Sequence, residues 1–290
     1  MCLSLVRVNV RENMQAASQT LETKKSGFNP LTPLLDVCTV LGSGILSFLE
    51  ATGRLAAFTG QAVGHCFAPR FFPAQIARQL IDIGYYSLPV VGMTALFTGM
   101  VLALQSYTGF TRFNAESAIA GVVVLSITRE LSPVLAGLMV AGRVGAAIAA
   151  EIGTMRVTEQ IDALRTLSVN PFKYLIAPRV IAGTLMLPIL VLTGDIIGVM
   201  GGYIVSIYNL GFSPVSYLSQ TWDVMQNIDV VSGLAKAGVF GFIVAIMGCY
   251  HGFNSKRGAQ GVGSATTNAV VSASILILIF NYLLTQIFFS

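Results

Sequence analysis

The stretch VIAGTLMLPILVLTGDIIGVMGGYIVSI, residues 180–207, is apolar almost throughout, with Asp195 as its single charged residue. A helix needs about 20 predominantly apolar residues to cross the hydrocarbon core of a bilayer, and this stretch is longer than that. Four further stretches meet the same requirement, at about residues 86–108, 118–142, 233–253 and 267–289. The sequence therefore predicts an all-α membrane protein with five transmembrane helices.

The composition of the whole chain agrees with this class. Of the 290 residues, 54% are hydrophobic and only 10% are charged, whereas a soluble domain carries about 25% charged residues. A solvated surface cannot be built from so few charges. The four cysteines are scattered and form no C-x-x-C motif, so they predict neither a metal site nor a disulfide.

The N-terminal region divides into two parts before the spans begin. Residues 1–33 show no sustained period and are expected to form a flexible cytoplasmic tail. From residue 34 the polar side chains recur mostly at spacings of three or four, which makes one polar stripe along a helix. We expect residues 34–72 to form an amphipathic helix in the membrane interface and its connection to the first span. A helix packed against the bundle is the alternative.

The Lys and Arg residues of the predicted loops are distributed unevenly. Nearly all of them precede the first span, lie between the second and third spans, or lie between the fourth and fifth, whereas residues 209–231 contain none. Cytoplasmic loops carry an excess of Lys and Arg. The distribution predicts a cytoplasmic N-terminus and a C-terminus on the opposite, outer side of the membrane, in agreement with an odd number of spans.

Charged residues inside predicted spans are candidates for function, because an ionised group at the bilayer centre costs about 2.5–3.5 kcal/mol. Arg129 and Glu130 are adjacent in the second span and point about 100° apart on a helix, so each should face protein or a watery cavity. They either line a substrate path or belong to a structural polar network. Asp195 and Lys236 lie in the third and fourth spans, and we expect them to pair with each other or with another polar group at that depth.

The loop between the second and third spans contains TMRVTEQIDALRTLSV, residues 154–169. Helical spacing places four of its residues on one face, namely Val157, Ile161, Leu164 and Ser168. Pro171 should prevent the helix from continuing. The pattern predicts a short amphipathic helix at about residues 154–167, which is either a docking element for a cytoplasmic partner or merely structural.

The motifs that the chain lacks also limit its function. It has no G-x-x-x-x-G-K-[ST] phosphate loop and no H-E-x-x-H or G-x-S-x-G motif, and His65 and His251 are isolated. These absences disfavour an intramembrane enzyme. A secondary transporter or channel working alone is also disfavoured, because five unequal spans show no inverted repeat.

Residues 126–183 carry four motifs in order, R-E-L-x-P, A-G-R-x-G, A-E-I-G-x-M-x-x-T-E-Q and N-P. With GMVLALQSY at residues 99–107, they resemble the MlaE/YrbE permease family, the membrane subunits of MCE-type lipid ABC transporters. The resemblance covers about residue 74 to the C-terminus. It implies a permease transmembrane domain over residues 73–290, preceded by an N-terminal interfacial helix.

The resemblance implies the partners of such a chain. It would form a homodimer with phospholipid in a cavity between the two copies, a cytoplasmic ABC ATPase below and a periplasmic MCE-domain protein above. A small cytoplasmic accessory subunit could also be present, whereas no nucleic acid is expected. The chain would need no cofactor and would not be an enzyme, since the ATPase subunit binds and hydrolyses ATP.

The resemblance also implies site residues. The lipid pathway would include Leu102, Gln105, Tyr107, Phe110, Phe113, Arg129 and Glu130. Coupling to the ATPase would involve Glu151, Met155, Glu159, Gln160, Asp162 and Leu164. Asp195 departs from the family pattern, in which an apolar residue is expected.

These expectations combine into one functional prediction. The chain should be the permease subunit of a transporter in the bacterial inner membrane that moves phospholipid between that membrane and a periplasmic MCE protein. Such transport would serve outer-membrane lipid homeostasis, in either direction. Import of a sterol or other hydrophobic compound by a related MCE system is the alternative.

Overall fold

The structure is a computed structural model that describes residues 32–66, 72–113 and 118–289. Nearly all of the predicted tail therefore lies outside the described residues, as does part of the predicted connection to the first span. Every regular element within the described ranges is helical, which confirms the predicted fold class. The chain divides into two units, residues 1–56 and 57–290, and each is described by itself.

The first described element is the helix α2 (Thr32–Cys66), within which the first unit ends. Leu46 and Leu49 are exposed on it, and an ion pair of 3.0 Å joins Arg54 Nη1 to Glu50 Oε1 one turn away. A long helix is thus present where the polar stripe predicted one. Its location in the membrane interface stays a prediction.

Five helical segments of the second unit are long and apolar enough to cross a membrane, which confirms the predicted number of spans. They are Pro73–Phe110, Ile119–Val157, Phe172–Tyr208, Asn227–Phe253 and Ala259–Phe289. Each begins or ends beyond the purely apolar stretch that predicted it, because its helix continues into more polar sequence. The region expected to be an external loop, 209–231, contains a helix of its own and the start of the fourth span.

The spans are built from consecutive helical elements. The first comprises α3 (Pro73–Ile83), η2 (Tyr85–Ser87) and α4 (Leu88–Phe110), and η3 (Thr111–Phe113) follows it. The second comprises α5 (Ile119–Ser126), η5 (Ile127–Leu131), α6 (Ser132–Val140), η6 (Ala141–Gly145) and α7 (Ala146–Val157). The third comprises η7 (Phe172–Ile176) and α9 (Ala177–Tyr208), and the last two are α11 (Asn227–Phe253) and α12 (Ala259–Phe289). Two short helices, α8 (Gln160–Thr166) and α10 (Pro214–Val224), complete the unit.

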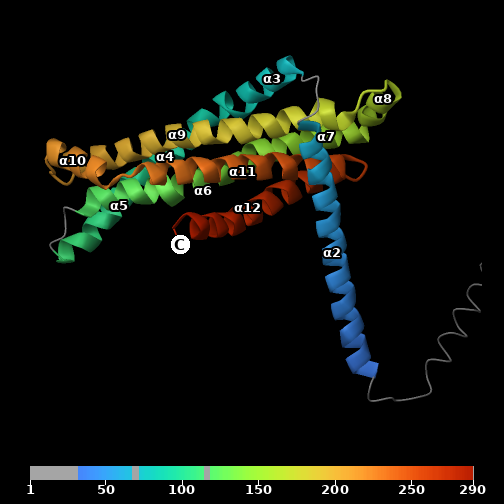
Figure 1. The fold of residues 1–290 in the computed structure, drawn as a ribbon, viewed down its shortest axis with the longest axis horizontal. Helices are drawn as coiled ribbons and strands as arrows, with labels where there is room; N and C mark the ends of the chain where they lie inside the picture. Colours follow the sequence, from blue (N-terminus) through green and yellow to red (C-terminus); the bar gives the residue numbers. More distant parts are fainter. Residues whose placement is uncertain (1–31, 67–71, 114–117, 290) are drawn as a thin grey trace, which may run out of the picture. The chain divides into compact units, whose positions relative to one another are not determined.

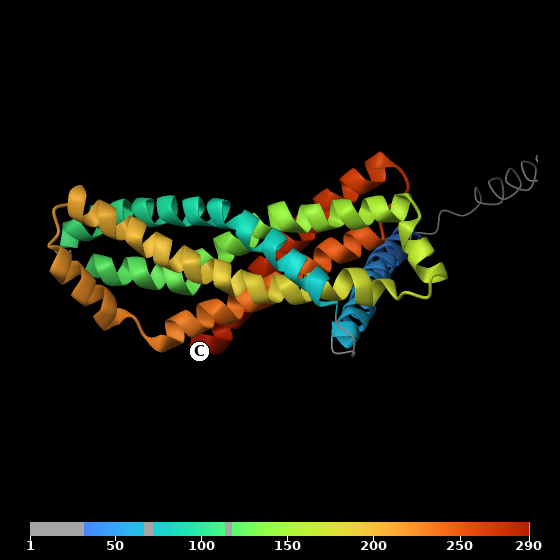
Figure 2. The ribbon, with the colours of Figure 1, turned by 90° about the horizontal axis from the view of Figure 1, so that it is seen from above.

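The long helices of the second unit lie side by side, with α8 and α10 at opposite ends of the bundle (Figures 1 and 2). Helix α9 packs against α3, α4 and α11. Glycines permit this close approach, since a Cβ atom at Gly99 of α4 would collide with the carbonyl group of Gly198, and one at Gly241 of α11 with that of Gly183. Small residues serve the same purpose at helix interfaces in membrane proteins generally.

The predicted helix over residues 154–167 is wrong as a single element. Helix α7 carries the second span through Val157, and the chain then breaks at Glu159, whose φ of 59° lies in the left-handed region. Helix α8 follows and is only one to two turns long. The chain leaves it at Ser168, φ 60°, before Pro171, so that Pro171 precedes the next helix rather than ending this one.

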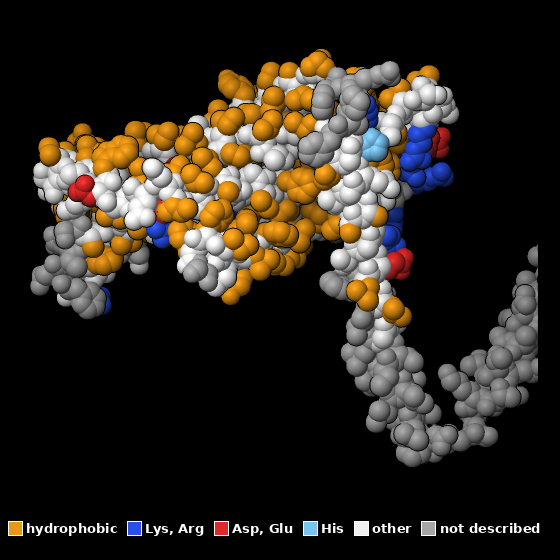
Figure 3. Space-filling view, viewed as in Figure 1, with side chains coloured by type: hydrophobic (Ala, Val, Ile, Leu, Met, Phe, Trp, Pro, Cys, Tyr) orange, Lys and Arg blue, Asp and Glu red, His pale blue; other side chains and the backbone are white. Residues whose placement is uncertain are grey.

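The surface of the second unit reflects a membrane environment. In Figure 3 its flank is mostly hydrophobic, and charged side chains gather at the end that carries α8. Large apolar side chains are well exposed on the flank, among them Phe97, Ile196 and Ile275. Lipid, rather than water, is the solvent that such a flank requires.

Candidate functional site

The charged residues of the second span lie in η5, which is a π-helical segment. Such segments are rare and often mark functional sites. Arg129 and Glu130 keep about a third of their side-chain surface accessible, at 33% and 38%. Both face helices α11 and α12. The expectation was that each faces protein or a watery cavity.

Arg129 pairs with Asp229 of α11. Its Nε donates to Asp229 Oδ1 at 2.7 Å, and its Nη2 lies 2.7 Å from the same oxygen. The second carboxylate oxygen accepts from the backbone N–H of Gln226 at 2.9 Å, which caps the start of α11. The guanidinium carbon also lies 4.4 Å from the ring centroid of Phe289, at the end of α12. Asp229 itself is fully buried.

Glu130 pairs with Lys236, two helical turns beyond Asp229. The ammonium Nζ donates to Glu130 Oε1 at 2.7 Å, to the Arg129 carbonyl oxygen at 2.8 Å and to Thr285 Oγ1 at 2.8 Å. Glu130 also accepts from Thr285 Oγ1 at 2.9 Å and from Asn281 Nδ2 at 2.8 Å. A lysine has three N–H donors, and here each has an acceptor although Lys236 is fully buried.

We call Arg129, Glu130, Asp229, Lys236, Asn281 and Thr285 the polar network. Its two cations and two anions cancel, so that it places no net charge among apolar helices. It joins the second, fourth and fifth spans. Burying ion pairs is tolerable only when hydrogen bonds satisfy the remaining polar atoms. Those bonds are present for the buried Asp229 and Lys236, whereas Asn281 Oδ1 is buried without a partner.

Asp195 and Lys236 do not pair with each other. Lys236 finds another polar partner, Glu130, which is the second form of the expectation. Both carboxylate oxygens of Asp195 are buried without a hydrogen-bond partner. The neighbouring Ser132 hydroxyl donates to the carbonyl oxygen of Val191 at 3.2 Å. Asp195 thus has no charged partner among the described residues, and the Ser132 hydroxyl beside it is the polar side chain within its reach.

The pathway residues implied on α4 pack next to the second span. Leu102, Tyr107 and Phe110 are partly buried against a buried cluster of α4, α5, η5 and α9, namely Ala103, Ile119, Val123, Ile127 and Val205. Gln105 is exposed, and the side chain of Phe113 lies outside the described part of the chain. The structure thus brings Leu102, Tyr107 and Phe110 against one buried cluster, without a direct polar contact to Arg129 or Glu130 among the described residues.

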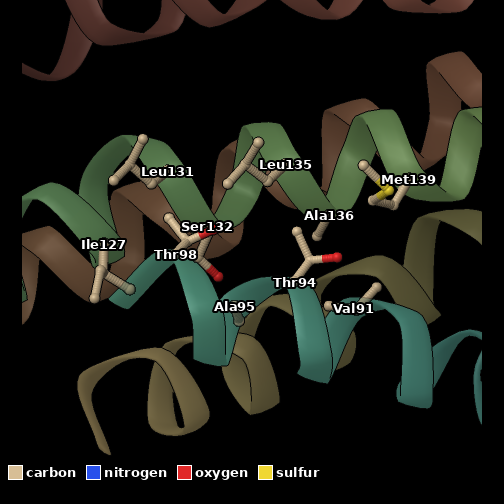
Figure 4. A pocket seen from close by; sticks show the side chains of 10 residues that line it. All are labelled: Val91, Thr94, Ala95, Thr98, Ile127, Leu131, Ser132, Leu135, Ala136 and Met139. Atoms are coloured by element: carbon tan, nitrogen blue, oxygen red, sulfur yellow. The ribbon is translucent and has the colours of Figure 1, made fainter. Parts of the chain in front are cut away.

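A narrow crevice follows α4 along the second span (Figure 4). Thr94 and Thr98 of α4 face Leu131 and Leu135 across it. Its volume of about 10 Å³ is room for about one water molecule. An acyl chain would enter it only if the two helices separated.

The residues implied in ATPase coupling lie at the α8 end of the bundle. Asp162 pairs with Arg156 and Arg165 at 3.5 and 3.3 Å, and Glu159 lies 3.9 Å from Arg257. Gln160 is exposed and Leu164 is partly buried, whereas Ile161 is fully buried and anchors α8. Leu167, just beyond α8, is 72% exposed.

A polar cleft of about 310 Å³ lies beside this end, with Glu151 and Met155 in its wall. Arg179 is 4% exposed and pairs with Glu151 at 2.8 Å, and its Nη1 donates to the carbonyl oxygen of Leu175 at 2.7 Å. Arg78 and Gln75 line the side formed by α3. The cleft is a charged surface that a protein partner could contact.

Asp229, Asn281 and Thr285 were not anticipated from the sequence. Asp229 stands seven residues before Lys236, a spacing that places both on one helix face, but it falls in the stretch expected to be a loop. Asn281 and Thr285 are four residues apart on α12, which is likewise one face. No group of three or more His, Cys, Asp or Glu side chains in the described ranges could hold a metal ion.

Comparison with known proteins identifies the class of this chain. Residues 76–287 match the family model described as Permease MlaE. A probable ABC transporter permease protein of Rickettsia felis is 60% identical over 256 residues, which cover 88% of this chain and 99% of that protein. A probable ABC transporter permease protein of Synechocystis is 44% identical over 237 residues, 81% and 90% of the two chains.

A third relative carries a more specific name. The intermembrane phospholipid transport system permease protein MlaE of Haemophilus influenzae is 35% identical over 262 residues, which cover 88% of this chain and 98% of that protein. The family match over residues 76–287 includes the spans that hold the polar network and the α8 end. The chain therefore belongs to the MlaE permease family and is a multi-pass ABC transporter permease of the bacterial inner membrane.

Proposed function

We propose that this chain is the transmembrane subunit of an ATP-driven transporter that moves phospholipid between the inner membrane and a periplasmic MCE-domain protein. The observation that carries the proposal is the polar network, in which Arg129 and Glu130 stay partly accessible while their partners are buried. The name of the Haemophilus influenzae relative supports phospholipid as the cargo.

The network suits a lipid head group for a chemical reason. Arg129 shares its Nε and Nη2 with one carboxylate oxygen of Asp229, which leaves Nη1 without a partner in the described residues. Guanidinium groups bind phosphate oxygens through charge-assisted hydrogen bonds. The apolar and aromatic side chains of Leu102, Tyr107 and Phe110 would lie along the acyl chains. A head group at Arg129 would thus be held within apolar surroundings.

The α8 end would receive the ATPase subunit. Glu159, just before helix α8, and Gln160 and Asp162 of α8 face solvent near the exposed Leu167. A mixture of charges around an apolar contact is typical of a non-obligate interface. We therefore assign ATP hydrolysis to a separate cytoplasmic subunit and leave this chain without catalytic residues.

The remaining partners follow from the same proposal. The α8 end would lie in the cytoplasm and the α10 end in the periplasm, next to the MCE-domain protein. The first and fifth spans have the smallest share of buried residues within this chain, so we assign the contact with a second copy to them. A small accessory subunit would bind on the cytoplasmic side.

The test measures phospholipid retained by the complex and transferred by it. The double variant Arg129→Gln with Asp229→Asn removes both charges of one pair, so that no unpaired charge is left buried. We expect retained phospholipid to fall about tenfold, the effect of losing charge-assisted hydrogen bonds worth about 1.5–3 kcal/mol. Mass spectrometry of purified complexes measures the retained phospholipid, and ATP-dependent transfer between proteoliposomes measures its transport.

The control is Arg54→Gln, which breaks an exposed ion pair on α2 and should leave both readings unchanged. Wild-type retention and transfer in the double variant would show that the network does not bind the head group. Retention of a sterol in place of phospholipid by the wild-type complex would instead support import of a sterol or another hydrophobic compound.

A further inference from the structure

Arg143, the arginine of the A-G-R-x-G motif, takes no part in the polar network or in the α8 end. It lies within the second span, in η6, which like η5 is a π-helical segment. The other arginines of the second and third spans each lie within 3.5 Å of a carboxylate oxygen, namely Arg129, Arg156 and Arg179. Arg143 forms no ion pair within the described ranges, where its charge is therefore not balanced.

The hydrogen bonds of Arg143 engage one of its three side-chain nitrogen atoms. Its Nη1 donates to Ser87 Oγ at 2.6 Å and to the Asp82 carbonyl oxygen at 3.3 Å. Both acceptors are neutral, and the Asp82 carboxylate lies 4.0 Å from Arg78 Nε instead. Arg143 is partly exposed, and its Nε and Nη2 are not among the buried polar atoms that lack a partner. A guanidinium has five N–H donors, so the three on Nε and Nη2 remain open to an acceptor from outside the described chain.

Exposed tyrosine and methionine side chains surround this guanidinium. Its central carbon lies 5.9 Å from the ring centroid of Tyr86. Tyr85 and Tyr86 are 66% and 56% exposed, and Met139, one turn before Arg143 on the second span, is 39% exposed. Tyrosines gather where a membrane meets water. Arg143 is thus placed at the depth of lipid head groups.

The helices that meet at Arg143 mark the same depth. Helix α3, which lines the polar cleft at the α8 end, contains Arg78 and Asp82, whereas α4 contains no charged residue. Ser87 stands at the junction of these two helices. One turn further along each span, Val91 and Met139 lie at the near end of the crevice in Figure 4. Arg143 therefore has polar sequence on one side and apolar surface on the other.

We infer that Arg143 binds the phosphate group of a phospholipid in the leaflet at the α8 end, which is the inner leaflet in the orientation proposed above. Guanidinium groups bind phosphate oxygens through two parallel hydrogen bonds, and Nε with Nη2 offers such a pair. Basic pockets on the cytoplasmic side of membrane proteins bind anionic head groups. The acyl chains would lie along the exposed apolar flank at Met139. The site is about 20 Å from Arg129 along the span, at 1.5 Å per residue, and it does not require transport.

Photo-crosslinking of the full chain in dodecyl maltoside, a detergent without phosphate, tests the inference. The probes are phosphatidylglycerol and diacylglycerol with the same acyl chains, each with a diazirine at the glycerol end of one chain. We expect phosphatidylglycerol to label the peptides that contain η2 and η6 about tenfold more than diacylglycerol, the effect of hydrogen bonds to a charged group. Arg143→Gln should remove this difference.

Further variants separate the bound phosphate from other effects. Arg143→Lys keeps the charge without the planar pair of donors, so its preference for phosphatidylglycerol should be intermediate. Arg112→Gln removes an exposed arginine beyond the opposite end of the first span and should label like the wild type. Arg129→Gln with Asp229→Asn should also keep this labelling, so that a failure of the proposed transport path is distinguishable from a failure of this site. Thermal unfolding of each variant checks that the fold is kept.

Three results would overturn the inference. Equal labelling by the two probes, or a preference that Arg143→Gln does not lower, would show that no phosphate is bound there. Competition by inorganic phosphate as strong as that by an equimolar amount of unlabelled phosphatidylglycerol would indicate a site for a free anion. Loss of labelling when the chain is assembled with its partner subunits would mean that protein, rather than lipid, covers Arg143.

Discussion

Lys236 shows how a charge can be held at full burial among apolar helices. Lys236 belongs to α11, whereas the three oxygen atoms that accept hydrogen bonds from its ammonium group belong to residues of η5 and α12. Desolvating an ammonium group costs several kcal/mol, and only close acceptors in good geometry offset that cost. The residue therefore stabilises the contact between three spans as long as Glu130 remains ionised beside it.

Removing this cation should destabilise the chain strongly. We expect Lys236→Met to lower the free energy of unfolding by about 3–5 kcal/mol, because it leaves Glu130 without its counter-charge. Adding Glu130→Gln to the same chain should restore most of that loss. Unfolding in detergent, arranged as a double-mutant cycle, measures the coupling between the two residues.

The control for this cycle is Lys256→Met, which changes an exposed lysine in the loop before α12. It should alter the free energy of unfolding by less than about 0.5 kcal/mol. Additive effects of the two network substitutions would contradict the pairing seen in the structure.

Among the helical elements, the break between α7 and α8 is distinctive because a residue other than glycine adopts a left-handed conformation there. Glu159 adopts a left-handed conformation, which costs a residue other than glycine roughly 1–2 kcal/mol. The side chain is largely exposed, and its 3.9 Å approach to Arg257 is a weak surface contact. The strained position thus has little local compensation, which suggests a role in contact with the ATPase.

Substitution at Glu159 should separate folding from coupling. Glu159→Gly removes the conformational strain, so we expect stability to be maintained or raised by up to about 1 kcal/mol. Glu159→Val should lower stability, because a β-branched residue tolerates this conformation poorly. The glycine variant should nevertheless bind the ATPase subunit less well, as measured by co-purification and ATP-dependent lipid transfer.

The comparison variant is Glu159→Asn, which accepts the left-handed conformation but lacks the charge. Full ATPase binding by both the glycine and asparagine variants would show that the Glu159 side chain takes no part in docking.

The features that could be predicted from the sequence were those that leave a local signal in it, such as a long apolar run or a charge within such a run. Apolar length was sufficient to find every span, because the bilayer demands it. Helix ends were missed where polar sequence continues a helix, as in α3 and α7. The break at Glu159 was missed because a glutamate carries no preference for that conformation. Arg129, Glu130 and Lys236 stood out as charges in apolar runs, whereas Asp229 lay in a presumed loop and its pairing depended on tertiary packing.

For the whole molecule, the uneven charge distribution yields a prediction about sidedness. Charged side chains gather at the α8 end of the second unit (Figure 3), and an excess of Lys and Arg marks the cytoplasmic side. We expect alkaline phosphatase fused after Ser290 to be active, because that enzyme folds in the periplasm. Green fluorescent protein fused at the same point should not fluoresce.

A fusion within the loop that follows α8 should behave in the opposite way, fluorescent with green fluorescent protein and inactive with the phosphatase. Equal activity of the phosphatase at both positions would contradict a single orientation of the five spans.

The contacts of α12 with η5 have a consequence for the order of events during synthesis. Glu130 and Thr285 are 155 positions apart, and a ribosome adds about 5–20 residues per second, so Glu130 waits roughly 8–30 seconds for this partner. Throughout that interval the second span is in the membrane without its complete set of partners. A nascent chain that terminates before Asn281 never acquires them. The last helix therefore completes the polar network, and we expect chains that lack it to be less stable and more easily degraded than chains that contain it.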